Sequence, residues 1–210
     1  MIDWPAIRLT LELSAITVVI LFVLGIPLAW WLAFTASRWR PVVAALISLP
    51  LVLPPTVLGF YLLLGFGWAG SLVPLAFSFT GLVIASVFYS LPFVVQPLEQ
   101  AFAELGRGPL EAAASLGASP LDRFLTVASP LAFRGYVTAL VLGFAHTVGE
   151  FGVVLMVGGN IPGKTRVLSI SIYEAVETME YGRAHILSAG LLVFSFGVLV
   201  SLYLLNGKRR

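Results

Sequence analysis

Long apolar runs separated by short polar stretches form the pattern of this chain. Five runs approach the roughly 20 apolar residues that a helix needs to cross the hydrocarbon core of a membrane. They cover residues 13–36, 42–65, 72–95, 137–156 and 186–205. The runs lack the alternating pattern of barrel strands, and backbone groups in lipid must be hydrogen-bonded within their own segment. The pattern predicts an all-α integral membrane fold, a bundle of about five transmembrane helices in a single domain over residues 1–210.

The composition narrows the class of protein further. Hydrophobic residues make up 59% of the 210 residues and charged residues only 10%, against about 25% charged in soluble domains. The basic residues are scattered between the apolar runs, so membrane lipid and not nucleic acid is the expected surrounding. The chain has no cysteine, which excludes a disulfide framework, a thiol nucleophile and a thiolate metal site. We expect no cofactor and no metal on this chain.

The placement of lysine and arginine predicts the orientation of the chain. With the N-terminus outside, eight basic residues fall on the inner side and four on the outer side. The positive-inside rule therefore favours a multi-pass protein with its N-terminus outside and its C-terminus in the cytoplasm. The outer four are Arg8, Lys164, Arg166 and Arg183.

The inner connection, about residues 100–133, is the longest polar stretch. A short helix starting near Leu110 would end at Gly117, since glycine readily adopts the left-handed conformation of a helix terminus. Ser119 and Pro120 suit the cap and first-turn positions of the next helix. The first helix carries an apolar stripe, which either docks into a groove of a partner or packs back under the bundle. The stripe consists of Leu110, Ala113, Ala114 and Leu116.

Prolines interrupt the second predicted span. Pro50, Pro54 and Pro55 each remove a backbone donor and clash with the preceding turn. Such a break is tolerated at membrane depth only where protein or a water-filled cavity satisfies the freed carbonyls. The segment either lines a pathway or forms a packing kink, in which Thr56 bonds back to a carbonyl one turn away.

An acidic residue lies in the fourth predicted span. Glu150 would cost about 2.5 to 3.5 kcal/mol in ionised form at the centre of a membrane, so it needs a partner or access to water. Gly149 and Gly152 flank it, and His146 precedes it by one turn. The acid is either part of a gate or a helix-locking hydrogen bond, or a water-exposed group near the outer interface. In its charged form it is a poor ligand for an anion.

The outer connection begins with a turn. In the sequence from Asn160 to Gly163, Pro162 and Gly163 suit the central positions of a type II turn. Lys164 and Arg166 follow, and they either attract anions to an outer mouth or are ordinary loop charges.

The inner connection resembles the cytoplasmic signature loop of ABC importer permeases. Glu111, Ala112 and Ala113 are followed by Gly117 and then by Pro130 in the register of that family, with a departure at Ser129. The resemblance implies a type I ABC importer permease with a coupling helix that docks on an ATP-hydrolysing subunit. The implied coupling residues are Leu110, Glu111, Ala112, Ala113, Leu116, Gly117 and Pro120.

Two further strings resemble the molybdate and sulfate branch of this family. They are LPLVLPP in the second span and GEFGVVLMVGGNIPGKTR from residue 149, and the second favours molybdate. The resemblance implies a permease subunit in the bacterial inner membrane that imports molybdate, with a sulfate, thiosulfate or tungstate permease as the alternative. The implied pathway or gate residues are Pro54, Pro55, Thr56, Gly149, Glu150 and Gly152, and the implied outer-mouth residues are Asn160, Lys164 and Arg166.

The resemblance also implies an assembly. Two copies of the permease would work with two ATP-binding subunits and an extracytoplasmic molybdate-binding protein. In that assembly ATP would be bound by the partner subunit. A membrane enzyme is disfavoured because no HExxH helix and no nucleophile-base spacing occurs. An ATP-independent secondary transporter remains the other alternative, and the coupling loop argues against it.

Overall fold

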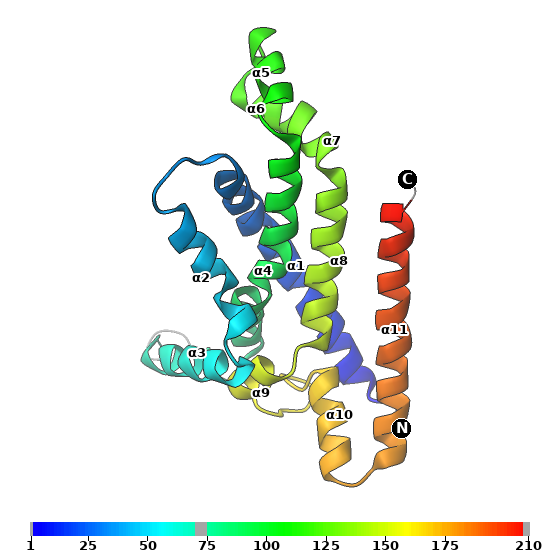
Figure 1. The fold of residues 1–210 in the computed structure, drawn as a ribbon. Coiled ribbons are helices and arrows are strands. Elements are labelled where there is room, and N and C mark those ends of the chain that lie inside the picture. Colours follow the sequence, from blue (N-terminus) through cyan, green and yellow to red (C-terminus); the bar gives the residue numbers. More distant parts are fainter. Residues whose placement is uncertain (1, 70–74, 208–210) are drawn as a thin grey trace.

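The computed structural model describes residues 2–69 and 75–207, and the described part is all helical (Figure 1). The long helices are α1 (Trp4–Phe34), α4 (Phe79–Leu105), α8 (Phe133–Gly149) and α11 (Tyr181–Gly207). The shorter ones are α2 (Arg40–Val52), α3 (Pro55–Ala69), α5 (Gly108–Ser115), α6 (Pro120–Asp122), α7 (Ser129–Leu131), α9 (Gly152–Gly158) and α10 (Leu168–Glu177). A π-helix, η1 (Arg123–Ala128), joins α6 to α7.

The helices account for the predicted membrane spans. In the described residues, α1, α4 and α11 are long and apolar enough to cross a membrane singly. Two bent pairs pass the same test together, α2 with α3 at an angle of 112° and the segment Pro120–Leu131 with α8 at 71°. Counting each bent pair as one span gives up to five, in agreement with the predicted bundle.

The first span begins earlier than predicted. Asp3 caps α1 by accepting a hydrogen bond from the Ala6 backbone N–H at 3.2 Å, and Pro5 occupies the first turn. Arg8 and Glu12, which precede the predicted start, lie one helical turn apart and form an ion pair at 2.7 Å. The helix tolerates both charges because they pair along its surface.

The third span ends later than predicted. The predicted start at residue 72 lies outside the described residues, but α4 runs well beyond the predicted end at residue 95. Pro92 and Pro97 do not end the helix, which stops only at Gly106, with a φ of 67°. A left-handed glycine is a common helix terminus, whereas the apolar pattern had placed the boundary where polar side chains begin.

α4 forms the centre of the bundle, with α1 and α8 packed against it (Figure 1). Its side chains Val94, Val95, Leu98 and Phe102 are fully buried in the largest core cluster. Small residues allow close helix approach: a Cβ at Gly143 of α8 would lie 2.6 Å from Val94 Cγ2.

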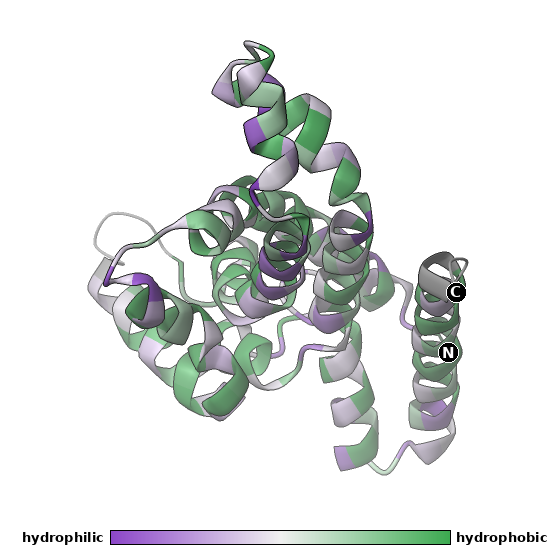
Figure 2. Ribbon diagram, turned by 45° about the horizontal axis from the view of Figure 1, so that its top comes forward, coloured by the Kyte–Doolittle hydropathy of each residue, from purple (hydrophilic) through white to green (hydrophobic). Residues whose placement is uncertain are grey.

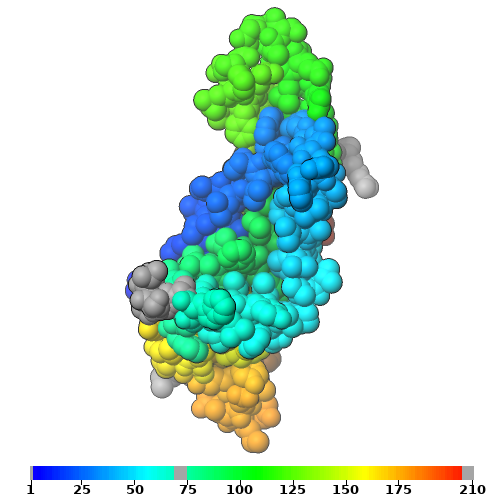
Figure 3. Space-filling view, turned by 90° about the vertical axis from the view of Figure 1, so that its left-hand side faces the viewer, coloured from blue at the N-terminus to red at the C-terminus, as the bar shows by residue number. Residues whose placement is uncertain are grey.

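The segment from α5 to α7 projects from one end of the bundle, opposite α10 (Figure 3, green and orange). The local predictions for this segment are confirmed. Gly117 has a φ of 87°. Ser119 caps α6 with Pro120 in its first turn, and a reciprocal capping box joins Ser119 to Asp122. The π-helix that follows widens the backbone ring before the chain enters α8.

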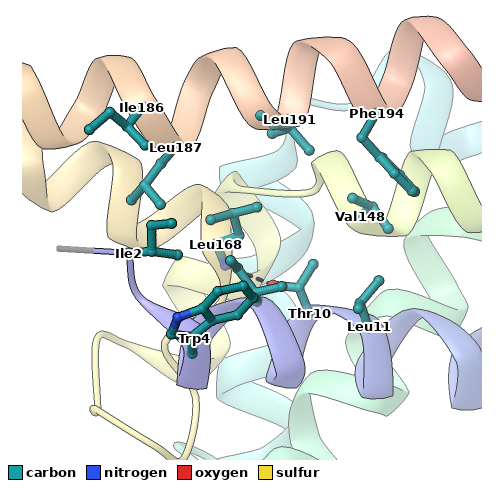
Figure 4. A pocket seen from close by; sticks show the side chains of 12 residues that line it. Ile2, Trp4, Thr10, Leu11, Val148, Leu168, Ile186, Leu187, Leu191 and Phe194 are labelled. Atoms are coloured by element: carbon teal, nitrogen blue, oxygen red, sulfur yellow. Dashed lines mark hydrogen bonds between the residues drawn. The ribbon is translucent and has the colours of Figure 1, made fainter.

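α11 stands apart from the bundle and is hydrophobic along most of its length (Figure 2). Only 11% of the most apolar 18-residue stretch of α11 is buried. An apolar groove with a cavity of about 330 Å³ separates it from α1 and α8. Leu187 and Phe194 point across this groove (Figure 4). The face that α11 turns outward is therefore available to lipid or to another chain.

Candidate translocation site

A cavity of about 560 Å³ lies between the start of α3 and the connection from α8 to α9. It brings together five of the six residues that the sequence placed on the pathway. These are Pro55, Thr56, Gly149, Glu150 and Gly152, joined by Tyr89, Ala145, His146 and Phe151. Pro54, the sixth, immediately precedes α3. Residues that are far apart in the chain thus share one hollow, and their pathway role stays a prediction.

Pro54 and Pro55 mark the boundary between two helices, whereas Pro50, which was also predicted to interrupt the span, lies inside α2. The N–H of Leu53 still bonds to the Leu49 carbonyl at 3.0 Å, so α2 is intact up to that point. Pro54 then offers its carbonyl to the N–H of Val57 at 2.9 Å, and Pro55 opens α3. Because proline cannot continue the earlier helix but suits the first turn of a new one, the chain turns sharply here. The start of α3, at Pro55 and Thr56, lines the cavity.

The fourth span is also broken, where the sequence predicted a continuous helix over residues 137–156. α8 ends at Gly149, Glu150 is extended with a ψ of 133°, and α9 begins at Gly152. A Cβ on Gly152 would lie 2.7 Å from Pro55 Cβ, whereas one on Gly149 would meet nothing within 4 Å. Gly152 therefore permits the contact between α3 and α9 that closes one side of the cavity.

Glu150 is buried, with 4% of its surface exposed. Both carboxyl oxygens are enclosed, and neither has a hydrogen-bond partner in the described part of the chain. The Ser86 hydroxyl lies near this carboxyl group and is also buried, but the contact between them does not have the geometry of a hydrogen bond. The backbone carbonyl of Glu150 does accept a hydrogen bond, from Ser169 Oγ at 2.5 Å. In this conformation the acid lies neither in a helix-locking hydrogen bond nor at a water-exposed surface.

His146 is held by a chain of hydrogen bonds in the wall of the cavity. Its Nδ1 lies 2.9 Å from Ser90 Oγ, which lies 3.0 Å from Thr147 Oγ1. The imidazole ring stacks on Phe93 at 3.8 Å and lies 5.0 Å from the ring of Tyr89.

The contribution of α4 to this site was not found from the sequence. Ser86, Tyr89 and Ser90 lie within an apolar run that the hydropathy pattern treats as uniform. Their spacing of three and four residues, which places polar groups on one face of a helix, is the signal that points to them.

The coupling residues lie in the projecting segment. Within α5, every residue is at least partly exposed, and Leu116, just after it, is 90% exposed. Leu110 and Pro120 line a second cavity, of about 700 Å³, with Trp30 and Phe124. The apolar stripe therefore does not pack as a whole under the bundle. Of the other coupling residues, Glu111, Ala112 and Gly117 are exposed and Ala113 is half-buried.

The predicted outer-mouth residues lie close to α10. The turn is confirmed: the N–H of Lys164 bonds to the Ile161 carbonyl at 3.1 Å, and Gly163 has a φ of 69°. Arg166 forms an ion pair with Glu174 at 3.0 Å, and its Nε donates to Asn160 Oδ1 at 2.5 Å. The charge of Arg166 is thus compensated within the chain, while Lys164 is exposed.

The long apolar helices, with a broken helical segment on either side of one cavity, define a multi-pass membrane protein. Residues 25–210 match the family described as binding-protein-dependent transport system inner membrane component, and the chain belongs to that family.

Its relatives include molybdenum and sulfate permeases. The chain is 58% identical to the molybdenum transport system permease protein ModB of Azotobacter vinelandii, over 96% of this chain and 93% of the relative. It is 31% identical to ModB of Escherichia coli K12, over 99% and 95%. Identity to the sulfate transport system permease protein CysT of a Synechocystis strain is 35%, over 89% and 69%.

Solved structures confirm the type of fold. The methionine ABC transporter MetNI, in an inward-facing conformation, matches with a TM-score of 0.77 at 18% identity, over 94% of this chain and 91% of that one. A bacterial alginate ABC transporter in complex with a periplasmic protein that holds an alginate pentasaccharide matches with a TM-score of 0.71 at 19% identity, over 98% and 77%. The described chain has the all-helical fold of type I ABC importer permeases.

Proposed function

We propose that this chain is the membrane-spanning permease subunit of an ATP-driven importer that carries molybdate into the cytoplasm. The observation that carries the proposal is the 58% identity, over nearly the full length of both chains, to a molybdenum permease. Sulfate permeases are more distant, at 35% identity or below among those compared. A tungstate or sulfate cargo remains the alternative within the family.

The proposed assembly contains two permeases, two ATP-binding subunits and an extracytoplasmic binding protein. The exposure of Leu116 and of most of α5 supports docking of the ATP-binding subunit on the projecting segment, because an apolar side chain in water gains free energy when it is covered. ATP is bound by that subunit, and this chain is non-catalytic. The N-terminus lies outside and the C-terminus in the cytoplasm, on the side of α5.

In the proposed mechanism, ATP-driven movement of the ATP-binding subunits displaces α5. The displacement passes through η1 and α7 into α8, whose far end borders the cavity at Gly149. A rigid helix that joins the docking segment to the cavity wall transmits a rotation over its length. The cavity then opens alternately to the two sides of the membrane.

The test is uptake of labelled molybdate into proteoliposomes that contain this chain, its ATP-binding subunit and its binding protein. ATP-dependent uptake that excess sulfate does not suppress is the expected result. Suppression by sulfate would move the cargo to the sulfate branch, and uptake without ATP would contradict the ABC assignment. A Walker-lysine variant of the ATP-binding subunit is the matched control for the energy source.

A further inference from the structure

The cavity between α3 and α9 has no fixed positive charge among its described lining residues. Its titratable groups are Tyr89 from α4, His146 from α8 and Glu150 from the connection to α9, while α3 and α9 contribute none. An anion that enters this space is therefore not held by a salt bridge. It has to be met by neutral hydrogen-bond donors or by the backbone.

The hydrogen-bond chain fixes the role of His146. Thr147 Oγ1 donates its single hydrogen to the Gly143 carbonyl at 2.9 Å, so in its contact with Ser90 it is the acceptor. Ser90 donates its only hydroxyl hydrogen to Thr147, so it must accept a hydrogen bond from Nδ1 of His146. The neutral imidazole therefore carries its proton on Nδ1 and leaves a lone pair on Nε2. His146 in this form cannot donate a hydrogen bond into the cavity.

Glu150 differs from the other lining residues because its hydrogen-bonding capacity is unused. Its carboxyl group is enclosed and has no partner in the described residues, although it borders the cavity. A buried carboxylate without a partner is strongly disfavoured, whereas a buried neutral carboxylic acid without a partner costs about 1 to 3 kcal/mol. Unpaired buried polar groups are uncommon in native structures, and each calls for a structural or functional explanation.

We propose that Glu150 remains a neutral carboxylic acid during transport and donates a hydrogen bond to the oxyanion as it passes between α3 and α9. The proton stays on Glu150, so no proton is transferred to the cargo. Neutral donors suit a pathway, since an anion bound by a fixed positive charge would be slow to leave. The inference rests on the proposed function and names the residue of that pathway that contacts the cargo.

The test compares Glu150→Gln with Glu150→Ala in the reconstituted complex at saturating binding protein. Glutamine keeps the shape and a donor, so its rate of molybdate uptake should stay within about twofold of the wild type. Alanine removes the donor to a charged ligand, and uptake should fall about tenfold. Glu12→Gln, which neutralises an exposed acid 2.7 Å from Arg8, is the matched control and should leave uptake unchanged.

The second measurement is the pH dependence of uptake, which does not rely on the alanine variant folding. Uptake by the wild type, divided by uptake by Glu150→Gln, should fall as the pH rises, because ionisation removes the donor only where Glu150 is present. Contributions of Tyr89, His146 and the partner proteins cancel in this ratio.

A ratio that rises with pH, or a glutamine variant as impaired as alanine, would overturn the inference, since either result means that the ionised carboxylate is the working form. Full uptake by an assembled Glu150→Ala complex would overturn it as well. Absence of ATP-dependent uptake in the wild-type arm would instead overturn the proposed function and the inference with it. Basal ATP hydrolysis by each complex reports whether it has assembled.

Discussion

Arg183 Nη2 lies 3.1 Å from Asp3 Oδ2, so the first turn of α11 is ion-paired to the residue that caps α1. Both side chains are mostly buried, and Ser171 Oγ of α10 donates to the same carboxylate oxygen at 2.8 Å. Three helices therefore meet at one carboxylate. Because α11 buries little of its own surface, this carboxylate is a polar link between α11 and the bundle.

The link should make stability depend on pH. Burial alone would raise the pKa of Asp3, but hydrogen bonds from Ser171 and the Ala6 N–H and the charge of Arg183 outweigh it and hold the pKa below its ordinary value of 3.8. A carboxyl group with a lowered pKa stabilises the fold above its unfolded-state pKa, and this stabilisation is lost as the pH falls through the folded-state value. The melting temperature of the wild type should therefore drop more steeply below about pH 4 than that of Asp3→Asn.

Thermal unfolding in detergent, followed by tryptophan fluorescence between about pH 3 and 6, measures this difference. Glu12→Gln is the control for removal of an exposed acid. Equal acid slopes for the wild type and Asp3→Asn would show that the ion pair contributes no pH-dependent stability.

A single hydroxyl joins α1 to the start of α10. Thr10 Oγ1 donates to the Ala6 carbonyl and accepts from the Leu168 N–H, both at 2.8 Å. Figure 4 shows the contact between Thr10 and Leu168. Thr10→Val keeps the shape but leaves the buried N–H without an acceptor, which should lower the free energy of unfolding by about 1 to 3 kcal/mol. Thr10→Ser keeps the hydroxyl and should cost less. Chemical denaturation measures the free energy of unfolding of both variants. A larger decrease for Thr10→Ser than for Thr10→Val would contradict the role of the hydrogen bond.

A close approach of α8 to α4 depends on Gly143. An alanine there places Cβ 2.6 Å from Val94 Cγ2, so Gly143→Ala should destabilise the protein by about 1 to 3 kcal/mol. Gly190→Ala in α11 meets nothing within 4 Å and should be neutral or stabilising by up to about 1 kcal/mol. Melting temperatures of the pair test the prediction, and similar shifts for both would rule out a steric cause.

Leu116 should matter for coupling and not for folding. It is 90% exposed, so Leu116→Ala should leave the melting temperature unchanged. If it docks on the ATP-binding subunit, the loss of its side chain should weaken that association about tenfold or more. Leu192→Ala, at a 69% exposed leucine of α11 and outside the projecting segment, is the control. Pull-down of the ATP-binding subunit measures the effect, and equal binding by both variants would place the docking surface elsewhere.

Features set by local chemistry could be predicted from the sequence. Gly117, the Ser119 cap and the turn at Pro162 and Gly163 each depend on backbone preferences of a few adjacent residues, and all three are present. The apolar runs likewise gave the helical membrane fold, because hydropathy is a property of the segment itself.

Features set by contacts between distant segments could not be predicted from the sequence. The break after Gly149 depends on the approach of Gly152 to Pro55, which no local pattern reveals. The 112° angle between α2 and α3 has the same origin, since prolines permit a bend without fixing its size. The pairing of Arg166 with Glu174 required the position of α10.

The π-helix η1 sets the direction in which the projecting segment faces. Each residue of an α-helix advances the chain by about 100° around its axis, and each residue of the wider π-helix by somewhat less, so removal of one residue from Arg123–Ala128 would rotate the preceding segment by roughly a quarter of a turn. The residues on the surface of α5 would stay the same, but the surface would face in a different direction. The length of this six-residue π-helix therefore determines the direction in which the whole coupling segment faces.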